Sequence, residues 1–149
     1  MSLRARDLGK VILDTYFNDL YQEVVEEMVE DERSALDVET DILNIDHAEV
    51  GAWLAARWKF PDILVNPIAA HHNLMSAEEG FLKESTIVHL ANILTKRAGI
   101  GLCYETDIQE PSDLVQSELR LGDAQISKIE EGLEGERDQI NQFFSYLSG

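Results

Sequence analysis

Four histidines are the residues of this sequence whose types and spacing best suit chemistry. All of them lie between residues 47 and 89, and two of them, His71 and His72, are adjacent. Imidazole nitrogen binds divalent metals of the zinc, iron and manganese kind, so the group is a candidate metal cluster. Adjacent side chains on an α-helix point about 100° apart, so both reach one site only at a frayed helix end or across a broad site. The alternative is a set of histidines that cap helices or form hydrogen bonds in the core.

The elements that position these histidines are predicted to be helices, because apolar residues recur at steps of three and four. One amphipathic helix is expected over residues 8–30, and a short helix over residues 34–43. Asp46, with Glu49 three residues later, is typical of a capping box. The next helix therefore starts at His47.

The other histidines fall on two further predicted helices. Pro61 suits the first turn of a helix that runs towards His72, and Pro67 should kink or split that helix. Residues 81–98 are apolar almost all round, so we expect a central helix there, with His89 inside it. A last helix is predicted near the C-terminus, weakened in its middle by two glycines.

The charge balance argues against several partner classes. Twelve basic residues face 29 acidic ones, for a formal net charge of −17. Nucleic acids and anionic membranes attract basic surfaces, so we expect neither as a partner. No apolar run reaches the roughly 18 residues of a membrane helix, and residues 1–10 lack the apolar stretch of a signal peptide. With a single cysteine, Cys103, no intrachain disulfide can form, which fits a cytoplasmic protein.

Four stretches resemble, in order, motifs of the HDOD domain family. Residues 46–61, DHAEVGAWLAARWKFP, resemble the family's DHxxVGxxLxxxWxxP run, and residues 68–73, IAAHHN, resemble its paired-histidine run. Residues 87–92, IVHLAN, are similar to its ivhLAD stretch. Residues 6–13, RDLGKVIL, resemble HDiGKlil, the segment that gives HD domains their name. The motifs at residues 46–61 and 68–73 are specific when taken together, and the other two are weak alone.

The resemblance implies a fold and a division of the chain. It predicts an all-α, HD-domain-like bundle of about six to eight helices, corresponding to the C-terminal part of the domain. The core is expected over residues 1–104, with a helical extension packing on it over 105–149. A complete HD core has further helices before the HD pair, so helices 8–30 and 84–98 are expected to lack cover. We therefore expect a longer protein or a homo-oligomer formed through the uncovered face.

The resemblance also implies a ligand set. In catalytic HD relatives, one or more metals activate water against a phosphate ester. Two of the ligand positions are changed here: Arg6 replaces the histidine of the HD pair, and Asn92 replaces the final aspartate. Arginine has no lone pair for a metal and repels a dication, and an asparagine oxygen is a poorer ligand than a carboxylate. Four residues match ligand positions, of which the first is the catalytic candidate: Asp7, His47, His71 and His72.

Several of these residues also have a purely structural interpretation. Arg6 and Asp7 can form a local ion pair at an exposed helix start. Asn92, in an apolar helix, must find hydrogen-bond partners, and either of the paired histidines is a candidate, in which case the site is a polar network. Trp53 and Trp58 are expected in the core.

The changed positions favour regulation over catalysis. HD-GYP relatives carry a Gly-Tyr-Pro segment after the paired histidines, whereas residues 73–80 contain none, which argues against cyclic-di-GMP hydrolysis. We expect a non-catalytic module of bacterial signalling that binds protein partners and has no cofactor. The alternative is a phosphohydrolase with a reduced ligand set that holds Fe, Mn, Zn, Ni or Mg. A sensor that binds a small ligand in the decayed pocket is a third interpretation.

Overall fold

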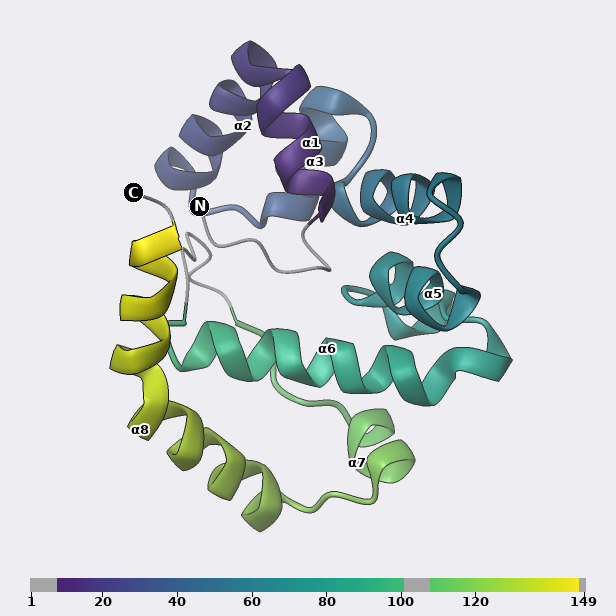
Figure 1. The fold of residues 1–149 in the computed structure, drawn as a ribbon, viewed down its shortest axis with the longest axis vertical. Helices are drawn as coiled ribbons and strands as arrows, with labels where there is room; N and C mark the ends of the chain where they lie inside the picture. Colours follow the sequence, from purple (N-terminus) through teal and green to yellow (C-terminus); the bar gives the residue numbers. More distant parts are fainter. Residues whose placement is uncertain (1–7, 101–107, 148–149) are drawn as a thin grey trace.

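The fold is an assembly of α-helices (Figure 1). The computed structural model describes residues 8–100 and 108–147, and over these ranges the chain contains no strand. The predicted all-α class is confirmed, and none of the helices in these ranges is long and apolar enough to cross a membrane. The helices are α1 (Leu8–Tyr16), α2 (Asn18–Glu30), α3 (Ala35–Leu43), α4 (His47–Arg57), α5 (Asp62–Ala70), α6 (Leu82–Arg97), α7 (Asp113–Leu119) and α8 (Asp123–Leu147), with short 3₁₀ turns η2 (Leu74–Ser76) and η3 (Glu79–Phe81) before α6.

The first three helices share one apolar cluster. The prediction of a single helix over residues 8–30 is wrong, because the chain bends at Phe17 between α1 and α2. A straight helix of that length would extend about 35 Å and could not fold both of its halves around α3. The bend places Leu13 of α1 and Val24 of α2 in the same buried cluster as Val38 of α3.

The predicted caps of α3 and α4 are confirmed. The Ser34 hydroxyl accepts a hydrogen bond from the Asp37 backbone N–H at 3.2 Å. The Asp46 carboxylate accepts one from the Glu49 N–H at 2.9 Å, and the Glu49 carboxylate accepts one from the Asp46 N–H at 3.4 Å. These reciprocal bonds satisfy backbone donors that a helix start leaves open, and so they fix where α4 begins. Its first residue is His47.

Small residues let α1 and α5 approach α4 closely. Ala48, Gly51 and Ala55 are buried on α4, and a Cβ built on Gly51 would lie 3.2 Å from the Ile68 side chain of α5. Since the small residues form the buried face, the bulky residues of α4 turn outwards. The expectation that both tryptophans lie in the core is therefore wrong, because Trp53 is 63% exposed and Trp58, just past the helix, is 55% exposed.

Pro67 does not split α5, which continues as one helix to Ala70. The ring of Pro67 is buried, and only the last turn of α5 lies on its C-terminal side. The C-terminal end of α5 is therefore the point at which the paired histidines leave the helix.

Helix α6 is central, as predicted, but it is not apolar all round. It lies between α5 on one side and α7 and α8 on the other (Figure 1). The residues buried in its first half are mostly polar, whereas Ile87 is 49% exposed. The predicted end is confirmed, because Gly99 adopts φ +62° and the N–H of Ile100 donates to the Thr95 carbonyl at 3.0 Å. The polar residues buried along α6 are Ser85, Thr86, His89 and Asn92.

The two C-terminal helices cover the second half of α6. Leu90 and Leu94 of α6 are buried in a cluster with Val115 of α7 and Ile126 of α8. The expectation that residues 84–98 lack cover is therefore wrong for this face. The two glycines of α8 lie within one continuous helix of 25 residues.

Candidate metal centre

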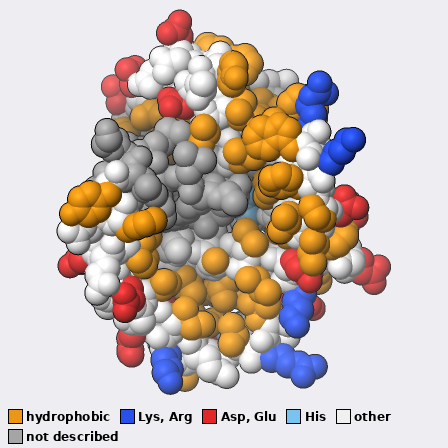
Figure 2. Space-filling model, in the orientation of Figure 1, with side chains coloured by type: hydrophobic (Ala, Val, Ile, Leu, Met, Phe, Trp, Pro, Cys, Tyr) orange, Lys and Arg blue, Asp and Glu red, His pale blue; other side chains and the backbone are white. Residues whose placement is uncertain are grey.

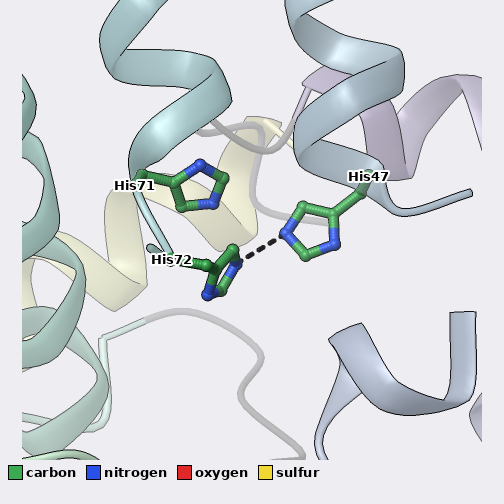
Figure 3. A group of neighbouring side chains, drawn as sticks. All are labelled: His47, His71 and His72. Carbon is green, nitrogen blue, oxygen red and sulfur yellow. Dashed lines mark hydrogen bonds between the residues drawn. The ribbon is translucent and has the colours of Figure 1, made fainter. Parts of the chain in front are cut away.

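Three of the four histidines converge on one point. His47 opens α4, His71 caps the C-terminal end of α5, and His72 follows it (Figure 3). One ring nitrogen of each lies within 4.8 Å of the others. The adjacent pair can reach a single site because it lies where the helix ends, so the helical angle no longer separates the two side chains.

A buried carboxylate holds the His47 ring in place. The Glu39 Oε2 atom accepts hydrogen bonds from the His47 backbone N–H at 2.8 Å and from its ring Nδ1 at 2.6 Å. Tyr21 donates its hydroxyl to the other carboxylate oxygen at 3.4 Å. Both Glu39 and His47 are fully buried. Because a carboxylate only accepts, Nδ1 carries the proton and the Nε2 lone pair points to the cluster.

Hydrogen bonds to backbone carbonyls orient the rings of His71 and His89. His71 donates its Nδ1–H to the Ile68 carbonyl at 2.7 Å, which leaves Nε2 as its unprotonated nitrogen. His89 donates its Nδ1–H to the carbonyl of His71 at 2.7 Å. The fourth histidine of the sequence therefore supports the backbone of the cluster from α6 and is not part of the group of ring nitrogens.

His72 completes the cluster as a neutral ring. Its Nε2 atom lies 2.8 Å from the Nε2 atom of His47 (Figure 3). Burial lowers the pKa of His72 far below its ordinary value, and the neighbouring His71, His47, Lys96 and Lys10 lower it further. A neutral imidazole keeps a lone pair, so either a hydrogen bond or a metal ion can join these two rings.

Asn92 lies near the cluster but does not belong to its hydrogen-bond network. Its side chain is 5% exposed and lines a pocket of about 410 Å³ together with His71, His72 and His89. Among the described residues, no hydrogen bond joins its amide to His71 or His72, so neither of these two candidate partners is found. Arg6 and Asp7 lie outside the described residues.

Glu39 is the functional residue that sequence reasoning missed. It is one of 29 acidic residues, and it lies eight positions before the histidine that it supports. Neither the helical spacing nor the capping pattern of α3 distinguishes it from its exposed acidic neighbours. Its role comes from two hydrogen bonds between its carboxylate and the first residue of α4, which no local pattern encodes.

A comparison with known families matches the part of the chain that contains this cluster. The family model of the HDOD domain matches residues 5–74. Residues 5–74 belong to the HDOD domain family. The matched stretch contains Glu39, His47 and the paired histidines, and it ends where η2 begins.

One curated relative extends beyond this HDOD stretch. An uncharacterized protein of Treponema pallidum (strain Nichols) is 31% identical over 120 residues. The match covers 77% of this chain but 23% of that protein. No solved structure matches the chain.

The donor set of the HDOD cluster fits one transition-metal ion. Three imidazole nitrogens are a known ligand set for zinc and also suit neighbouring first-row dications, which hold nitrogen at about 2.0–2.1 Å. The Nδ1–H bonds of His47 and His71 direct their Nε2 atoms to the centre, as outer partners of metal ligands do. Magnesium prefers oxygen ligands, so this cluster suits it poorly.

Proposed function

We propose that this HDOD chain is a non-catalytic module of bacterial signalling that acts in the cytoplasm through contacts with other proteins. The observation that carries the proposal is the amide of Asn92. It is buried beside His71 and His72, at the position where the resemblance to catalytic relatives calls for an aspartate. A neutral amide supplies no negative charge to balance a dication or to bridge two of them.

The hydrogen bonds of the cluster support a structural use of the old site. Tyr21 of α2, Glu39 of α3, His47 of α4 and His72 after α5 form one chain of bonds. Buried polar groups are stabilising only when they are paired, and here each bond links a different element. The site therefore fixes the relative positions of four segments without any reaction.

A metal-dependent phosphohydrolase with a reduced ligand set is the second candidate. The observation that favours it is the convergence of three ring nitrogens within 4.8 Å, with two of them oriented by Nδ1–H bonds. His47, His71 and His72 would hold the metal. A bound dication would supply an activated water and polarise a phosphate ester.

Metal content separates the two candidates. We expect the untagged protein, purified without chelator, to hold far less than one equivalent of iron, manganese, zinc or nickel by elemental analysis. Dialysis against each metal followed by desalting should not raise it to one equivalent. Since the amide of Asn92 adds no charge, an Asn92→Asp variant should gain metal relative to the wild type.

Metal bound by the three histidines would contradict the proposed function. Near-stoichiometric metal in the wild type that falls in both His47→Ala and His72→Ala, but not in His89→Gln, would overturn the proposal. Hydrolysis of bis(p-nitrophenyl) phosphate by the loaded protein would then support the second candidate. His89→Gln is the matched control because His89 is buried nearby but lies outside the group of ring nitrogens.

A further inference from the structure

The corner between α4 and α5 exposes several large apolar side chains. Figure 2 shows hydrophobic side chains over these two helices, with basic side chains at their margin. Together they expose on the order of 500 Å² of apolar surface, as much as the largest patch on a typical monomer, which is often functional. We call these residues, each 43–63% exposed, the aromatic corner: Trp53, Trp58, Phe60, Ile63 and Leu64.

Two cations, Arg57 and Lys59, border the aromatic corner. The Arg57 guanidinium lies 5.7 Å from the centroid of the Trp53 ring. Neither Arg57 nor Lys59 forms an ion pair with a carboxylate of the described residues, whereas Arg33 and Arg97 each pair with two. Within residues 53–64 the single carboxylate is Asp62, so the corner has a net positive charge in a chain of charge −17.

This charge argues against a corner that pairs with itself. A twofold contact would bring Arg57 and Lys59 of one copy close to the same residues of the other, and like charges across an interface oppose association. The favourable counterpart is therefore a surface that is both apolar and acidic.

The chain has such a surface at the bend between α1 and α2. Tyr16, Phe17 and Leu20 are 74%, 52% and 45% exposed. Asp19 and Glu23 of α2 are also exposed. They lie four residues apart, one turn of the helix, on either side of Leu20 in the sequence. We call these five residues the acidic bend.

We propose that the acidic bend of one copy docks on the aromatic corner of a second copy. The apolar side chains of the two surfaces cover each other, and Asp19 and Glu23 meet Arg57 and Lys59. The contact joins two different surfaces, so it is heterologous. This inference names a surface for the protein contacts of the proposed function, but it does not depend on whether the histidine cluster binds a metal.

Sedimentation velocity of the full chain from low micromolar to submillimolar concentration tests the contact. We expect the wild type to self-associate, and Trp58→Ala to weaken association about tenfold, because aromatic anchors dominate most interfaces. Arg57→Glu/Lys59→Glu and Asp19→Lys/Glu23→Lys should each weaken it by a similar factor. Mixing these two charge-reversed proteins should restore association, because the opposite charges then meet again.

A matched control separates this contact from a general effect of charge. Arg120→Glu/Lys128→Glu changes the net charge by the same amount at exposed positions on the far end of the chain, and it should leave association close to wild type. A wild type that stays monomeric throughout would overturn the proposal and leave the corner to a different protein. Charge-reversed proteins that fail to associate when mixed would also overturn it. Metal content is measured separately, so neither result decides the other.

Discussion

Gly9→Ala is expected to remove a large part of the stability of the fold. A Cβ at this position of α1 would lie 1.9 Å from the carbonyl oxygen of His47 and 2.9 Å from the backbone nitrogen of Gly51. Both contacts are with the backbone of α4, which cannot rotate away as a side chain can. Either α1 separates from α4 or the first turn of α4 shifts. We expect a loss of more than about 4 kcal/mol, a large part of the 5–15 kcal/mol of a typical domain.

Urea unfolding followed by circular dichroism measures this loss, and two other glycines calibrate it. Gly51→Ala meets softer contacts, 3.1 Å from the Gly9 nitrogen and 3.2 Å from an Ile68 methyl group, so it should cost about 1–3 kcal/mol. A Cβ on Gly132 meets nothing within 4 Å, and alanine in a helix interior should stabilise by roughly 0.5–1 kcal/mol. Near wild-type stability for Gly9→Ala would show that α1 does not pack on α4 as closely as the structure has it.

Local signals in the sequence predicted where helices start and end better than they predicted where the chain bends or which face of a helix is buried. The Asp46 capping box and the end at Gly99 were predictable, because a cap depends on residues within a few positions of each other. The bend at Phe17 was not, because the cluster that α1 and α2 share with α3 joins residues far apart in the sequence. The tryptophans were misplaced for a related reason: apolar character predicts burial, but the small residues of α4 decide which face is buried.

The clustering of the three histidines was predictable from the sequence, but the residues that support them were not. The resemblance brought His47, His71 and His72 together, and the structure places them within 4.8 Å of one another. It did not predict that His89 would bond to the backbone of the cluster. It also did not predict Glu39, because the contact of a buried carboxylate with a ring eight residues away depends on how two helices meet.

Removing the Glu39 carboxylate is expected to have the second large effect. In Glu39→Ala the backbone N–H and the ring N–H of His47 both lose their acceptor, and both are fully buried. Each buried donor left without an acceptor typically costs about 1–3 kcal/mol, so losing both bonds should cost about 3–5 kcal/mol. Glu39→Gln keeps one oxygen that can accept both bonds and an amide that can face Tyr21. Its cost should be smaller, about 1–2 kcal/mol, because an amide accepts more weakly than a carboxylate.

The matched control is another carboxylate of the same helix. Asp41 pairs with Arg33 at the surface and is 61% exposed, so Asp41→Ala should cost at most about 1 kcal/mol in the same urea unfolding experiment. The His47 ring also loses its orientation in Glu39→Ala, so the nuclear magnetic resonance signals of its ring protons should shift, while those in Asp41→Ala should not. Equal losses in Glu39→Ala and Asp41→Ala would mean that the carboxylate does not hold His47. The histidine cluster would then depend on the α4 cap and the end of α5 alone.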